Sequence, residues 1–239
     1  MVLFLLQTFI PSLPRYIYGE DPASQNDYFG IVIHEMPSST RANPKPVPLL
    51  RDVYALNHTS FDKIIDFHTR VLFPKFPPSL MVFDYTKERA FTDLMENRFG
   101  KSRVTKINFS ASTSGTKKML KDDGLSILKQ GYRFPNPASI KNPAKAELVR
   151  ELITQLKHEE MLLTPSGRES FDHPTGRHND LGIAWELSIH GCIQMGLKVD
   201  LPGNHVGSQI LEEHQLMQTL PVGDIATINS AFTHYSQLQ

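Results

Sequence analysis

The chain opens with short apolar runs typical of strands and continues with longer stripes typical of helices. Three runs rich in aromatic and β-branched residues predict strands over 15–21, 27–36 and 47–56, arranged as an antiparallel meander. Residues 60–73 then space their apolar side chains as a helix does, with Ser60 as a plausible N-cap. A continuous apolar run over 79–85 indicates a strand buried on both faces.

Helices dominate the rest of the pattern. The stretch KERAFTDLMENRFG predicts a helix that ends at Gly100, and 104–110 returns as a strand, so the two flanking strands should be parallel. Further helices are expected over 115–131, interrupted or kinked near Gly124, over 142–158, capped by Asn142, and over 180 to about 198. The expected fold class is α/β, with a mixed sheet of three antiparallel strands and then parallel strands, flanked by helices.

Composition excludes several classes of protein. The 239 residues, 40% of them hydrophobic, are enough for a large core, and the one cysteine, Cys192, rules out a disulfide framework and a cysteine-based zinc site. The apolar segment 1–14 is shorter than the roughly 20 residues of a membrane span and lacks the features of a signal peptide. We therefore expect a cytoplasmic protein with no membrane partner, in which 1–14 is a buried strand or a linker remnant.

Charge is balanced overall but unevenly distributed. The formal net charge is zero, yet residues 101–150 carry eleven Lys or Arg against three acids. Such a local excess favours a surface that faces phosphate, although solvated helix faces would give the same count.

Three aspartates stand at the ends of predicted elements. Asp21 and Asp84 close strands, and Asp180 opens the last helix. Asp21 could instead start a turn before Pro22, and Asp180 could be a simple N-cap. Carboxylates that converge repel one another, and a divalent cation relieves that repulsion. Oxygen-only ligands select Mg²⁺ or Mn²⁺, and two such ions would catalyse phosphodiester hydrolysis.

These segments resemble the nuclease domain of the large terminase subunit of viruses and phages. YGEDPASQNDYFGIVI is similar to its first motif, LMVFDYTKERAFTDLMENRFG to its second acidic strand and helix, and HPTGRHNDLGIAWEL to its last motif. The resemblance runs from about Tyr16 to Leu197. It implies a ribonuclease H-like fold and a Mg²⁺- or Mn²⁺-dependent endonuclease that cuts concatemeric viral DNA during packaging.

The resemblance also assigns residues and partners. Asp21, Asp84 and Asp180 match the catalytic, metal-binding triad, and Asp27, His178 and Asn179 match supporting positions. Double-stranded DNA is the implied substrate, with a separate packaging ATPase or a portal protein as further partners. The GTKK stretch of the basic region supplies candidate DNA contacts at Lys117, Lys118 and, one turn on, Lys121.

The chain departs from the family at three points. Asn179 stands where the family usually has Asp, which would weaken a second metal site, and Ile183 stands where a further Asp often follows. The sequence STSGTKKM also lacks the phosphate-loop pattern, so we expect no ATP hydrolysis.

Two other functions stay open beside the endonuclease. One is a catalytically weak or inactive terminase-like domain that binds DNA or a portal, and the other is a different ribonuclease H-like nuclease, such as a junction resolvase. We expect the nuclease domain to span 15–198, followed by an extension of unknown role over 199–239. The chain would then be an isolated nuclease domain, a split subunit or a provirus remnant.

Overall fold

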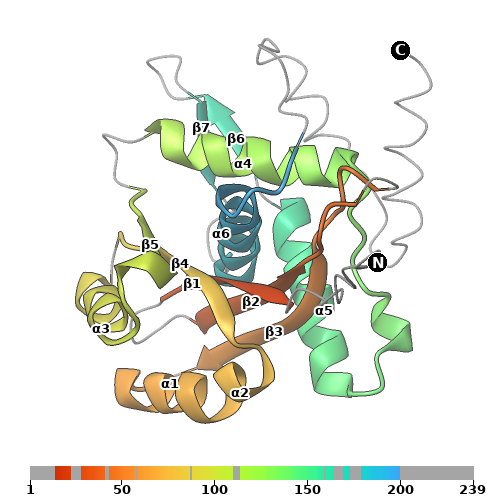
Figure 1. Ribbon diagram of the computed structural model, residues 1–239. Helices are drawn as coiled ribbons and strands as arrows, with labels where there is room; N and C mark the ends of the chain where they lie inside the picture. Colours follow the sequence, from red (N-terminus) through yellow and green to blue (C-terminus); the bar gives the residue numbers. More distant parts are fainter. Residues whose placement is uncertain are drawn as a thin grey trace, which may run out of the picture.

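A mixed sheet of five strands forms the centre of the structure (Figure 1). The computed structural model describes residues 14–22, 28–40, 43–57, 59–86, 88–109, 114–158, 160–163, 169–172 and 179–199. The strand order is β3-β2-β1-β4-β5; β1, β2 and β3 are antiparallel neighbours, whereas β4 and β5 run parallel to β1. The strands are β1 (Arg15–Asp21), β2 (Tyr28–Met36), β3 (Leu49–Asn57), β4 (Pro78–Asp84) and β5 (Val104–Ile107). The antiparallel meander and the later parallel strands that the sequence predicts are both confirmed.

Helices cover both faces of the sheet and give a three-layer architecture (Figure 1). One face carries α4 (Ser114–Lys129), α5 (Pro143–His158) and α6 (Asp180–Gln194). The other carries α1 (Phe61–Phe67), the π-helical turn η1 (His68–Leu72), α2 (Phe73–Lys75) and α3 (Arg89–Phe99). The remaining elements are the 3₁₀ turns η2 (Lys101–Arg103) and η4 (Pro137–Ser139) and the hairpin β6 (Glu160–Leu163) and β7 (Glu169–Asp172).

The apolar side chains of the sheet divide between two cores. On β4, Val82 packs into the core beneath α4, α5 and α6, and Phe83 packs into the aromatic core beneath α1 and α3. This is why the run over 79–85 is continuously apolar: both faces of its strand are covered.

Helix α6 is buried along most of its length because it lies between the sheet and α4. Two glycines of the sheet let it approach closely. A Cβ atom on Gly19 would collide with the backbone of Ala184 and Ser188, and one on Gly30 would lie 2.6 Å from the carbonyl oxygen of Asp180. Backbone contact therefore sets the distance between α6 and the sheet.

Some helical details differ from the sequence prediction. Helix α4 runs without interruption through Gly124, so the expected interruption is wrong, and the kink stays a prediction. A Cβ on Gly124 would lie 2.8 Å from the Trp185 ring, so the glycine serves packing. Ser60 occupies the N-cap position of α1 without a side-chain hydrogen bond. The Oδ1 atom of Asn142 does cap α5, accepting from the Ala144 amide at 3.0 Å.

The sequence also predicts where the last helix ends and where the domain begins and ends. Helix α6 ends at Gln194, four residues before the predicted boundary. Residues 1–13 and 200–239 lie outside the described residues, so the division at 14 and 199 stays a prediction. Within the described part of the chain, no helix is both long enough and apolar enough to cross a membrane.

Candidate active site

Asp21 and Asp84 lie side by side at one end of the sheet. The parallel register of β1 and β4 pairs Glu20 with Phe83, so the next residue of each strand is one of the two aspartates. Side chains alternate along a strand, and Val82 faces α6, so Asp84 also faces α6. By the same alternation Asp21 shares the face of Gly19, which contacts α6. Both carboxylates therefore stand on the α6 face.

The start of α6 brings Asp180 to the same place. Asp180 is the first helical residue, and its carbonyl lies against Gly30 of β2. Gly30 pairs with Asp21 across the antiparallel ladder. The three sequence-predicted acids thus come from β1, β4 and α6 to one end and one face of the sheet. Asp180 is buried, whereas Asp21 and Asp84 are half-buried.

The amides that open α6 are capped by another helix. Gln155 of α5 accepts hydrogen bonds at Oε1 from the Leu181 amide at 2.9 Å and the Gly182 amide at 3.0 Å. Asn179 occupies the N-cap position but makes no side-chain capping bond. The simple capping role that the sequence allowed for Asp180 is therefore filled by Gln155.

A hydrogen-bonded turn fixes the chain directly after Asp84. Its Oδ1 atom accepts from the Thr86 amide at 2.7 Å, and the Thr86 hydroxyl accepts from the Phe109 amide at 2.8 Å. The exits of β4 and β5 are thereby joined next to the candidate site.

The side chains of the described residues do not themselves form a ready-made metal site. Across the described ranges, no three His, Cys, Asp or Glu side chains are grouped closely enough to hold an ion. The supporting residues Asp27 and His178 lie outside those ranges. The donor chemistry of the three aspartates and their common position fit a hard divalent cation; their ligand role stays a prediction.

The expected DNA contacts have different environments. Lys117 and Lys118 are half-buried in the first turns of α4. Lys121 is only 6% exposed, and its Nζ atom forms a buried ion pair with Glu186 of α6. This ion pair joins α4 to α6 and makes Lys121 a less accessible candidate for a DNA contact than Lys117 and Lys118; its role in DNA binding stays a prediction.

Two functional candidates escaped the sequence analysis. Gln155 lies on the apolar stripe of α5 together with Leu152 and Leu156, and a polar residue on such a stripe was the available indication. For Glu20 the sequence offers no such indication, because its partner is distant in the chain. Glu20 is fully buried beside Asp21, and both of its carboxylate oxygens lie 3.0 Å from His68 Nε2, which donates to them.

The Glu20–His68 pair lies on the sheet face opposite the aspartates. His68 Nδ1 donates to the Ile64 carbonyl at 2.8 Å, so both ring nitrogens face acceptors. Burial lowers the pKa of His68, but the charge of Glu20 and these hydrogen bonds outweigh it and raise the pKa above its ordinary value. A buried ion pair thus anchors β1 one residue before Asp21.

Comparison with known proteins identifies the architecture. No protein-family model and no curated protein sequence matches the chain. Among solved structures, the large terminase nuclease from thermophilic phage G20c matches with a TM-score of 0.53 and 14% identity, over 74% of this chain and 82% of that one. This chain has the terminase nuclease fold.

Two further terminase nuclease structures agree. The magnesium-bound G20c nuclease gives a TM-score of 0.55 at 14% identity, over 75% of this chain and 82% of that one. The large terminase nuclease domain of Thermus phage P74-26 gives 0.50 at 15% identity, over 73% and 78%. The ribonuclease H-like mixed sheet expected from the sequence is confirmed.

Proposed function

We propose that this chain is a divalent-metal-dependent endodeoxyribonuclease of the terminase type, acting on double-stranded DNA in the cytoplasm of a host cell. One observation supports the proposal: Asp21, Asp84 and Asp180 stand at one end and on one face of a sheet with the terminase nuclease fold. A separate packaging ATPase and a portal protein are the partners that this function would require.

The three aspartates would hold Mg²⁺ or Mn²⁺, as two ions. Bound there, the metal supplies activation of the attacking water and stabilisation of the leaving oxygen of a phosphodiester. The chain itself would position the ligands. Adjacent parallel strands hold Asp21 and Asp84, and the close backbone contact at Gly30 holds the start of α6 near them.

Plasmid cleavage tests the proposal. In Mn²⁺ or Mg²⁺ the unmodified protein should nick and linearise DNA, and Asp84→Asn should lose at least about a hundredfold in rate, the scale of one essential electrostatic group. Asp66→Asn is the matched control. Asp66 is exposed on α1, pairs with Arg70 and lies on the face of the sheet opposite to the candidate site. Undiminished cleavage by Asp84→Asn would overturn the assigned site.

The same assay separates the other candidate functions. DNA binding without cleavage in either metal would favour an inactive terminase-like domain, as the Asn179 departure suggests. Preferential cutting of branched DNA would favour a junction resolvase.

A further inference from the structure

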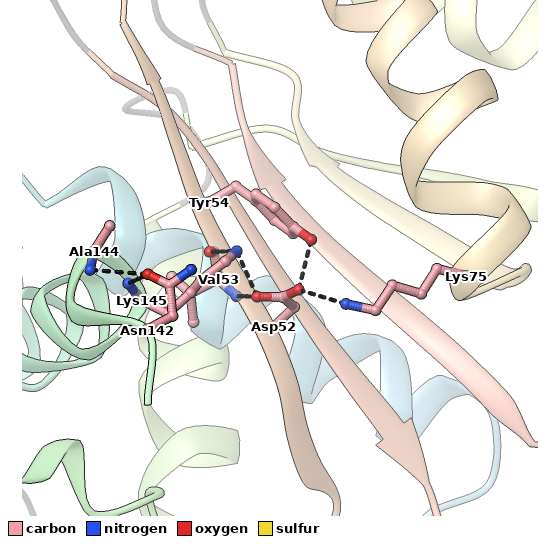
Figure 2. A network of polar contacts seen from close by, with 7 residues as sticks. All are labelled: Asp52, Val53, Tyr54, Lys75, Asn142, Ala144 and Lys145. Atoms are coloured by element: carbon pink, nitrogen blue, oxygen red, sulfur yellow. Dashed lines mark hydrogen bonds and ion pairs between the residues drawn. The ribbon is translucent and has the colours of Figure 1, made fainter. Parts of the chain in front are cut away.

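Helix α5 is fixed to the sheet at its first turn. The Lys145 Nζ atom forms an ion pair with Asp52 Oδ1 of β3 at 2.5 Å and donates to the Val53 carbonyl at 2.8 Å (Figure 2). The same ammonium lies over the Tyr54 ring. Asp52 Oδ2 also accepts from the Tyr54 hydroxyl at 2.5 Å and from Lys75 Nζ at 3.4 Å. The start of α5 is therefore tied to an edge strand by several polar contacts at once.

The last turns of α5 reach the start of α6. Gln155 lies ten residues after Lys145, about 15 Å along the helix. It is 7% exposed, its Oε1 atom caps two amides of α6, and its Nε2 atom donates to Glu151 Oε1 at 3.0 Å. One rigid element thus links the sheet to the turn that begins at Asp180.

The cap from Gln155 helps to hold the first turn of α6, which begins at Asp180. Leu181 and Gly182 follow it directly, and their buried amides have no helical partner in a first turn. Without the Gln155 oxygen these two donors would seek other acceptors, and the first turn of α6 would fray. Asp180 would then shift relative to Asp21 and Asp84, which the sheet holds independently.

We propose that Gln155 is a positioning residue for the metal site: through the Leu181 and Gly182 amides it holds the first turn of α6, and with it Asp180, at the end of the sheet that carries Asp21 and Asp84. This inference rests on the proposed function and adds a residue to it from outside the motifs of the chain. Gln155 acts on the ligand through the backbone and does not contact the ion itself.

Calorimetric titration with Mn²⁺ alone provides the test. Gln155→Met keeps the length of the side chain and removes the acceptor, so the Kd for Mn²⁺ should rise by about 10- to 100-fold, as for other residues that orient metal ligands. Glu151→Ala is the matched control, because it removes only the partner of Nε2, and its Kd should stay within about twofold of the unmodified protein.

A second variant and a second measurement keep a structural role distinguishable. Gln155→Asn retains the carboxamide but draws it back by one methylene group, and it should raise the Kd even where Gln155→Met does not fold. Hydrogen exchange at Leu181 and Gly182 should accelerate in both variants. A folded Gln155 variant with a lower Tm but an unchanged Kd would overturn the inference. Absence of Mn²⁺ binding by the unmodified protein would instead overturn the proposed function, and the inference with it.

Discussion

At the scale of single residues, a ring of buried hydrogen bonds surrounds His34. The Trp185 indole donates to the Tyr132 hydroxyl at 3.2 Å, and that hydroxyl lies 2.7 Å from His34 Nε2. On the other side His34 Nδ1 lies 2.8 Å from the Ser188 hydroxyl, which donates to the Trp185 carbonyl at 2.6 Å. Because the Ser188 hydroxyl donates its proton to the Trp185 carbonyl, it accepts from His34 Nδ1, and His34 Nε2 accepts from the Tyr132 hydroxyl. This hydrogen-bond network therefore requires a neutral imidazole at His34.

Acid should destabilise the protein through His34. Burial lowers the pKa of His34 from 6.5 to about 3 in the folded state. Between these values the unfolded chain binds a proton that the folded chain excludes, so stability falls as pH falls from 6.5 towards 3. The contribution is about 1.4 kcal/mol per pH unit.

Urea unfolding at several pH values would measure this contribution. His34→Gln removes the titrating group, so the difference in unfolding free energy between the unmodified protein and the variant should shrink as pH falls through that window. Parallel pH profiles for the two proteins would contradict the neutral assignment.

At the scale of elements, β3 is an edge strand that polar contacts hold to helices on both faces of the sheet. Asp52 binds Lys145 of α5 on one side and Lys75 of α2 on the other (Figure 2). Burial lowers the pKa of Lys145, while the hydrogen bond and charge of Asp52 oppose that shift. The carboxylate thus offsets part of the cost of burying the Lys145 ammonium, whose pKa stays below its ordinary value.

Removing this carboxylate should loosen both helices. Asp52→Ala leaves Lys145 without its anion and should cost about 1–3 kcal/mol of unfolding free energy. Glu35→Ala is a suitable comparison, because its partner Arg51 has a side chain that is 41% exposed, and the pair should contribute less than about 1 kcal/mol. Equal losses in urea titrations of the two variants would show that the Asp52 contacts are no stronger than a surface pair.

The same scale shows what sequence patterns predict and what they miss. Alternating and continuous apolar runs depend on burial, so β1 to β5 and α3 to α6 could be located from the chain alone. Asp21, Asp84 and Asp180 could be singled out because each stands at the end of such an element. Contacts between residues that are distant in the sequence cannot be recognised from a local pattern. The burial of Lys121 against Glu186 and the cap from Gln155 both depend on helices that come together only in the folded structure.

At the scale of the whole molecule, the formal net charge is zero, so the proposed function would need a local group of basic residues to bind DNA. Lys106 and Lys145 of the basic segment pair with acids, as Lys121 does. Lys117 and Lys118 follow the exit of β5, which runs parallel to β4 and so ends at the end of the sheet that carries Asp84. This position favours them as phosphate contacts.

Salt dependence should reveal these contacts. Each neutralised phosphate contributes about 0.9 to the slope of log Kd against log salt, so changing both Lys117 and Lys118 to Ala should reduce the slope by about 2. Lys141→Ala, an exposed lysine just before α5, should leave the slope unchanged. Fluorescence anisotropy with a short duplex at several salt concentrations would measure it, and an unaltered slope in the double variant would place the contacts elsewhere.

The backbone contact between α6 and the sheet has a consequence for how this architecture tolerates sequence change. At Gly19 and Gly30 the atoms nearest to an added Cβ belong to the main chain of α6, so both positions require glycine whatever the surrounding side chains are. The larger core residues can change together while α6 stays at the same height above β1 and β2. The sequence can therefore vary widely in the core under α6, but any side chain at these two positions would push the helix away from the sheet.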